Sequence, residues 1–97
     1  MILVNDTFIC KPGYASKLAR LLKDLMSGQP EMIHILTDMT GSFNKVVMVS
    51  EYEDLAGFEK SFEKYMQDSD EMKEIRQKMS GYQDMYLTGS REIYRVW

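Results

Sequence analysis

The chain has 97 residues, of which 44% are hydrophobic and 28% are charged, and its formal net charge is −3. A chain of this length buries only about 60 to 65% of its unfolded surface, so we expect one domain spanning residues 1–97. Lys and Arg alternate with Asp and Glu and form no basic stripe, which argues against a nucleic acid partner.

The N-terminal residues and the cysteine content indicate where in the cell the protein is expected. Four apolar residues precede Asn5, which is shorter than a signal-peptide core and far shorter than the roughly 20 residues of a membrane span. The single cysteine, Cys10, cannot form an internal disulfide, as is typical of a reducing environment. We therefore expect a cytoplasmic protein without a membrane partner, in which Cys10 is a small buried residue.

The first half of the chain predicts a strand, a helix and a hairpin. Residues 2–10 are rich in β-branched and aromatic side chains, and residues 14–26 carry leucines at helical spacing. Gly28 and Pro30 end the helix. Residues 32–39 form a second strand, and a loop over 40–44 connects it to a third strand over 45–52, so the two are antiparallel.

The second half predicts a broken helix and a last strand. Asp54 is a good N-cap residue for a helix that breaks or bends near Asp68, after which Ser69 caps a shorter piece. The final strand covers residues 84–97 and has a kink or bulge at Gly89–Ser90. The order β-α-β-β-α-β predicts an α+β, ferredoxin-like fold, in which both helices cover one face of a four-stranded antiparallel sheet.

Apolar residues occupy both faces of the predicted strands. On the third strand, Val47 and Val49 alternate with Val46, Met48 and Tyr52. The helices can bury only one of these sets, and a large exposed apolar patch is rare on a monomer. We therefore expect a homodimer in which two sheets face each other, and the alternative is a half-exposed sheet with scattered apolar residues. On the second strand, the same alternation separates two sets, Met32, His34 and Leu36 against Ile33 and Ile35.

Residues 40–72, "TGSFNKVVMVSEYEDLAGFEKSFEKYMQDSDEM", resemble NIPSNAP-type domains and, more loosely, antibiotic-biosynthesis-monooxygenase-like domains. Both are dimeric α+β barrels. The matching features are Gly41, Asn44, the valine-rich strand, Tyr52 before Asp54 and Leu55, and the acidic break in the second helix. Ser50 and Met72 stand where NIPSNAP sequences carry tryptophans, so no role of those rings is transferred to this chain.

The resemblance implies a small apolar pocket between the sheet and the helices of each protomer. In monooxygenase-like relatives such a pocket holds a phenol or quinol that reacts directly with oxygen. The candidate lining residues here are Met48, Phe58, Phe62, Tyr65 and Met66. Methionine and aromatic residues at helical spacing are also typical of an ordinary core, and this alternative stays open.

Asn5 and His34 are the candidate catalytic residues. Asn5 resembles the first-strand asparagine of haem-degrading and quinol-oxidising relatives, although neither helix has a histidine and the only tryptophan is Trp97. Asn5 could equally satisfy a neighbouring backbone or face solvent. His34 is the only side chain whose ordinary pKa suits acid–base chemistry near neutrality, but a lone strand histidine is usually structural.

The sequence therefore favours a protein that binds a small hydrophobic or aromatic molecule, with cofactor-free oxidation as a further step. The alternative is a non-catalytic dimeric interaction domain of the NIPSNAP type. We expect no cofactor: one Cys and one His are too few for a zinc site, the helices lack a histidine for haem, and no glycine fingerprint follows the first strand.

Overall fold

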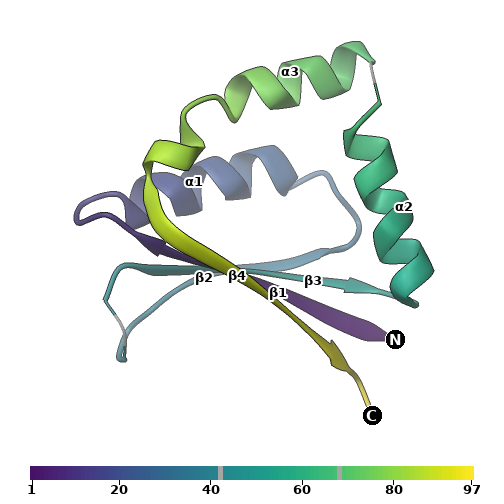
Figure 1. The fold of residues 1–97 in the computed structure, drawn as a ribbon, viewed down its shortest axis with the longest axis horizontal. Helices are drawn as coiled ribbons and strands as arrows, with labels where there is room; N and C mark the ends of the chain where they lie inside the picture. Colours follow the sequence, from purple (N-terminus) through teal and green to yellow (C-terminus); the bar gives the residue numbers. More distant parts are fainter. Residues whose placement is uncertain (42, 68) are drawn as a thin grey trace.

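Four antiparallel strands form one sheet in the order β2-β3-β1-β4, as the computed structural model of residues 1–41, 43–67 and 69–97 shows (Figure 1). The elements are β1 (Ile2–Cys10), α1 (Ala15–Met26), β2 (Met32–Thr37), β3 (Lys45–Tyr52), α2 (Leu55–Tyr65), α3 (Asp70–Lys78), the 3₁₀ turn η1 (Tyr82–Asp84) and β4 (Tyr86–Arg95). The predicted ferredoxin-like α+β fold and its element order are confirmed.

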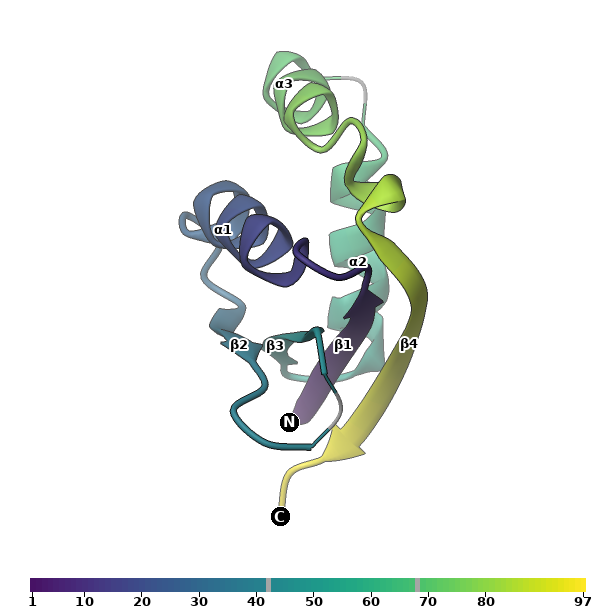
Figure 2. The same ribbon diagram turned by 90° about the vertical axis from the view of Figure 1, so that its left-hand side faces the viewer.

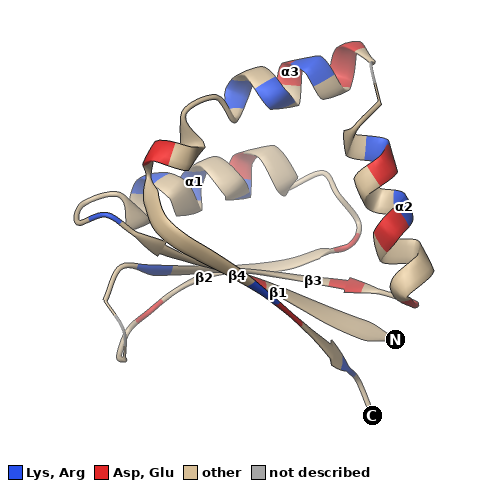
Figure 3. Ribbon diagram, in the orientation of Figure 1, with Lys and Arg blue, Asp and Glu red and all other residues tan. Residues whose placement is uncertain are grey.

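All three α-helices lie on the same side of the sheet (Figure 1). α1 packs close to the strands, whereas α3 lies farther from the sheet, above α1, in both views (Figure 2). The described part of the chain places no helix on the opposite side, which we call the open face of the sheet. Lys and Arg are interspersed with Asp and Glu along the described helices (Figure 3).

The two predicted caps in the second half of the chain are confirmed. The Asp54 carboxylate accepts a hydrogen bond from the Gly57 backbone N–H at 2.8 Å and starts α2. The Ser69 hydroxyl oxygen accepts one from the Met72 N–H at 3.2 Å and starts α3. The predicted break is therefore the segment between these two helices, and Asp68 itself lies outside the described residues.

The hydrophobic core lies between α1 and the sheet. It is built from the fully buried side chains of Cys10, Leu18, Leu22 and Val46. Burial raises the pKa of the Cys10 thiol, as expected for a small apolar residue of the core. In contrast, α2 has no fully buried residue among those described, so its attachment to the sheet depends on the contacts of a few half-buried rings.

Two irregularities differ from the sequence prediction. The bulge in the β1–β4 ladder lies at Leu87, between the pairs Ile9–Thr88 and Cys10–Tyr86, and Gly89 is in regular register opposite Phe8. The predicted bulge at Gly89–Ser90 is therefore wrong. The Phe8 and Tyr86 rings pack edge to face with centroids 5.0 Å apart, and this contact accompanies the displacement of Leu87 from the ladder.

The second irregularity lies in β2, where the register with β3 shifts between Met32 and His34. Met32 therefore lies opposite Ser50 on the helix side of the sheet, while His34 and Leu36 lie on the open face, opposite Val49 and Val47. The expectation that Met32 shares a face with His34 is wrong because strict alternation ignores this shift.

β2 also ends at Thr37, two residues earlier than the prediction of a strand over residues 32–39. At this point the Asp38 N–H still donates to the Lys45 carbonyl oxygen at 3.3 Å, while the Lys45 N–H donates to the Asp38 carboxylate at 2.8 Å.

Candidate functional site

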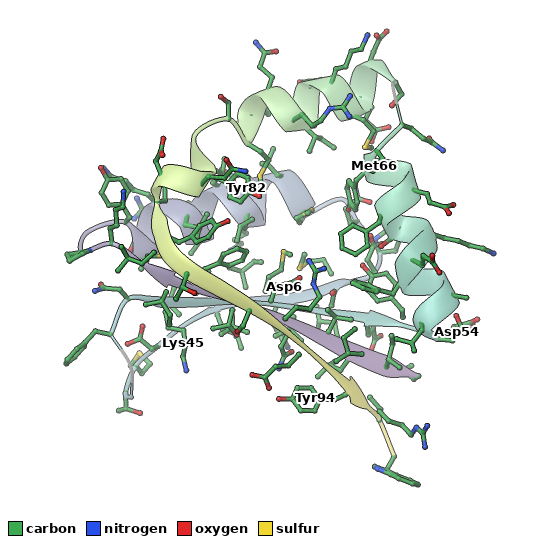
Figure 4. All side chains as sticks on the ribbon, in the orientation of Figure 1. Asp6, Lys45, Asp54, Met66, Tyr82 and Tyr94 are labelled. Atoms are coloured by element: carbon green, nitrogen blue, oxygen red, sulfur yellow. The ribbon has the colours of Figure 1, made fainter. Side chains whose placement is uncertain are left out.

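The space between α2 and the sheet contains an inner cavity of about 60 Å³. Four of the five predicted pocket residues line it: Met48 from β3 and Phe58, Phe62 and Tyr65 from α2. The fifth, Met66, follows the end of α2, is 79% exposed and does not line this cavity (Figure 4). The stripe of apolar residues on α2 thus faces the sheet as expected, and it ends one residue earlier than predicted.

Asp6, Arg91 and Glu31 are the charged residues that line the inner cavity, and Asp6 and Arg91 pair with each other. Asp6 is only 7% exposed, and its side chain lies on the helix side of the sheet (Figure 4). The Arg91 Nε donates to Asp6 Oδ1 at 2.5 Å. The Arg91 guanidinium also lies over the rings of Phe62 and Phe58, at 4.8 and 5.3 Å from their centroids. A single arginine therefore joins β1, β4 and α2 at this point.

Two hydroxyl groups form a second polar edge of the same cavity. The Ser61 hydroxyl donates to the Phe58 carbonyl oxygen at 2.6 Å and lies 3.3 Å from the Tyr52 hydroxyl. The rings of Tyr52 and Phe58 pack edge to face, with centroids 5.3 Å apart. These contacts fix the ring of Tyr52 against α2.

Tyr65 closes the inner cavity on the side of α3. Its hydroxyl donates to Glu31 Oε1 at 3.4 Å and lies 3.6 Å from the Met26 sulfur. Burial, followed by the negative charge of Glu31 and the neighbouring Tyr52, raises the pKa of Tyr65 to about 12. Tyr65 is therefore protonated at neutral pH and acts as a hydrogen-bond donor rather than a base.

A larger pocket of about 480 Å³ lies on the other side of Tyr65, beneath α3. Tyr65 and Met26 line both this outer pocket and the inner cavity. The outer pocket is also lined by the apolar side chains of Met72, Ile75, Met79 and Tyr82, together with Arg76, Ser80, Gly81 and Gln83. Its volume falls in the range of about 300 to 1,000 Å³ that is usual for small-molecule sites.

Asn5 and His34 do not line either space. Both lie on the open face, in one row across the sheet in which Val49 is opposite both of them. Two strand spacings separate them, which is roughly 10 Å. Asn5 Oδ1 is buried and has no hydrogen-bond partner among the described residues. His34 is exposed at the β2 edge, beside a shallow groove that Lys23 and Ser27 of α1 also line.

The sequence interpretation thus missed the polar residues that do line the inner cavity. Asp6 directly follows Asn5, and strand alternation places it with Val4 and Phe8, on the face that the helices bury. A charged residue among the buried positions of a strand is the signal that could have identified it. Arg91 carries no comparable signal, because its pairing with Asp6 depends on the β1–β4 register.

Among the described residues no group of three or more His, Cys, Asp and Glu side chains is arranged to hold a metal ion. No helix in the described part of the chain is long and apolar enough to cross a membrane.

No protein-family model and no curated protein matches this chain, but solved structures share its fold. A NIPSNAP-like domain protein from Burkholderia xenovorans superimposes with a TM-score of 0.79 at 18% identity, over 99% of this chain and 84% of its own. A NIPSNAP family protein of unknown function from Agrobacterium tumefaciens gives a TM-score of 0.75 at 15% identity, over 97% and 86%. A protein solved as an antibiotic biosynthesis monooxygenase gives 0.62 at 12% identity, over 100% and 99%. The resemblance seen in the sequence is therefore confirmed at the level of the fold.

Proposed function

We propose that this protein binds a small apolar molecule with an aromatic ring in the outer pocket beneath α3. The observation that carries the proposal is the size of that pocket, about 480 Å³, together with walls made largely of methionine and aromatic side chains. Thioether side chains adapt to the shape of a ligand, and a few polar groups in an apolar pocket fix its orientation. The Tyr65 hydroxyl is one such group.

Oxidation of the bound molecule by dioxygen, without a cofactor, is the finer part of the proposal. Its support is the fold shared with a protein solved as a monooxygenase, which is weaker support than the pocket itself. Uptake of dioxygen by the protein mixed with a ligand identified by the binding test below would be the measurement. A ligand that binds without uptake of dioxygen would support a binding protein and contradict the enzymatic activity.

Binding is tested by a thermal-shift screen with naphthalene derivatives. A ligand at 100 times its dissociation constant stabilises the folded state by about 2.7 kcal/mol, which is readily measured. The variant Ile75→Trp places a larger ring in the outer pocket and should abolish the shift. Gln77→Trp is the matched control, because Gln77 is an exposed residue of the same helix that does not line the pocket, and it should keep the shift.

The alternative function is a non-catalytic interaction domain whose partner is a second copy of the chain. The small volume of the inner cavity favours it, because most of the space between α2 and the sheet is filled by side chains. If no aromatic compound shifts the melting temperature of the wild type, or if Ile75→Trp responds as Gln77→Trp does, ligand binding in the outer pocket is excluded and the interaction domain becomes the better assignment.

A further inference from the structure

We infer that the inner cavity holds a neutral group of the ligand that both donates and accepts a hydrogen bond, with Asp6 as its acceptor and Arg91 as its donor. This inference rests on the proposed function, because the ring of the same ligand would occupy the outer pocket. The chemical class is a ring with an acidic hydroxyl or with a lactam edge, in which an N–H lies beside a carbonyl.

The first support is the incomplete pairing of a buried carboxylate. Asp6 has two carboxylate oxygens, and only Oδ1 forms a hydrogen bond within the described residues, with Arg91 Nε. Oδ2 is not among the enclosed side-chain atoms that lack a partner in the described residues, so it is open to the space beside it. Asp6 is 7% exposed and lines the inner cavity, so Oδ2 is an acceptor that a ligand in this space can use.

The second support is the fixed position of Arg91. Its Nε is engaged by Asp6, and its guanidinium plane is held by the rings of Phe58 and Phe62. Within the described residues its two η nitrogens form no hydrogen bond, although a guanidinium carries five N–H donors. Donors and an acceptor therefore lie side by side at one cavity, and Arg91, whose side chain is 44% exposed, is held there by its Nε bond and by the two rings.

The charges of the pair select a neutral ligand group. The positive charge of Arg91 is offset by Asp6 at hydrogen-bond distance, so an anionic ligand oxygen that approached Arg91 would be repelled by the nearby carboxylate. A neutral hydroxyl or lactam edge satisfies both partners, since it donates to Asp6 and accepts from Arg91.

The volumes of the two spaces indicate that the polar edge of the ligand lies in the inner cavity and its ring in the outer pocket. The inner cavity of about 60 Å³ is well below the roughly 150 Å³ of a cavity that admits benzene, so it has room for a polar edge but not for a ring. The outer pocket has room for the ring. Met26 and Tyr65 line both spaces, and the unbranched Met26 side chain can change rotamer to connect them.

The test compares pairs of compounds that differ in one hydrogen-bond donor. Calorimetry measures the affinity of β-naphthol against its methyl ether, and of the lactam carbostyril against N-methylcarbostyril. A hydrogen bond to a charged group is stronger than one between neutral groups, so at least one donor-bearing compound should bind at least about 10-fold more tightly than its methylated partner. The pair with the larger ratio identifies the hydroxyl or the lactam as the preferred group. β-Naphthoate should bind more weakly than either.

Asp6→Asn should remove the preference for the donor-bearing compound, because an amide can keep an oxygen toward Arg91 but then turns its N–H₂ group toward the ligand. Arg91→Lys keeps the charge opposite Asp6 but lacks the planar fork, so it should reduce the ratio of affinities between the donor-bearing compound and its methylated partner. It is the test variant if Asp6→Asn does not fold. Glu92→Gln is the control. Glu92 neighbours Arg91 on β4 but is opposite Asn5 in the ladder, on the open face, so the ratio should not change.

Each result decides a different claim. If all the compounds bind equally, to the wild type and to Asp6→Asn alike, the inference is wrong while the proposed function stands. If β-naphthoate binds most tightly, the pair selects an anion and the inference is again wrong. If no compound binds the wild type, the proposed function fails and the inference falls with it.

Discussion

Loss of the Tyr65 hydroxyl proton should lower the free energy of unfolding. The folded-state pKa of Tyr65, about 12, is higher than the ordinary value of 10, because of burial and of Glu31 and Tyr52. The neutral hydroxyl therefore contributes its full stabilisation below pH 10, and this contribution is lost as the pH rises from 10 to 12. We expect the free energy of unfolding of the wild type to fall more steeply in this window than that of Tyr65→Phe, in urea titrations at several pH values.

Tyr14→Phe is the control for this experiment, because Tyr14 is a more exposed tyrosine at the start of α1. It should retain the pH dependence of the wild type. The near-ultraviolet absorbance of tyrosinate should also show a component that titrates near pH 12 and is lost in Tyr65→Phe but kept in Tyr14→Phe. Equal pH dependence in both variants would assign the effect to other groups.

Leu18 tests the position of the hydrophobic core. It is fully buried between α1 and the sheet, so Leu18→Ala should lower the free energy of unfolding by about 2 to 5 kcal/mol through lost burial and an internal cavity. Leu87→Ala is the matched control, since Leu87 is 66% exposed at the bulge and should cost less than about 0.5 kcal/mol. Equal losses would show that the core lies elsewhere.

The candidate site was only partly predictable from single residues. The rings of Phe58, Phe62 and Tyr65 were expected at the pocket because helical spacing places them on one side of α2, and the structure places them there. Asn5 was preferred to Asp6 because strand interiors disfavour asparagine unless its amide has a hydrogen-bond partner, whereas the decisive property is the face on which the residue lies. That property was available from the alternation of β1.

At the scale of the element, α2 depends strongly on its N-cap. No residue of α2 is fully buried among those described, so local stabilisation is a larger share of its total than it is for α1. Asp54→Ala removes the acceptor of the Gly57 N–H and should cost about 1 kcal/mol, within a usual range of about 0.5 to 2 kcal/mol. Denaturant unfolding measures this loss. Glu53→Ala, one residue earlier and also exposed, should be nearly neutral.

The elements themselves were predicted well, while the irregularities within them were not. Periodicity and capping residues identify the helices and strands because they are local properties of the chain. The register shifts at Ile33 and Leu87 arise from how each strand meets its neighbour, which the residues of one strand alone do not determine. Asp84, the last residue of the 3₁₀ turn Tyr82–Asp84, was interpreted as the first residue of the last strand, which begins at Tyr86.

At the scale of the whole molecule, we propose that the open face of the sheet is covered by a second copy of the chain. Val47 and Val49 lie on this face, and Tyr94 projects from it (Figure 4). Light scattering should give twice the chain mass of 11.4 kDa at micromolar concentration. Val47→Glu should produce a monomer or unfold the protein, because burying an unpaired charge costs several kcal/mol.

Met66→Lys is the control, because Met66 is 79% exposed at the end of α2, on the helix side of the sheet. It should scatter as the wild type does. A folded wild-type monomer at this concentration would contradict the proposal.

The position of β4 has a consequence for the newly made chain. β1 pairs with β4 from Ile2 opposite Arg95 to Cys10 opposite Tyr86, so an early strand needs one that the ribosome adds much later. Asp6 and its partner Arg91 are likewise 85 residues apart in the sequence. Until β4 has left the ribosome, one edge of β1 has unpaired backbone groups and a carboxylate without its counter-charge. Such edges recruit other chains, so a ribosome stalled before β4 would present an aggregation-prone intermediate.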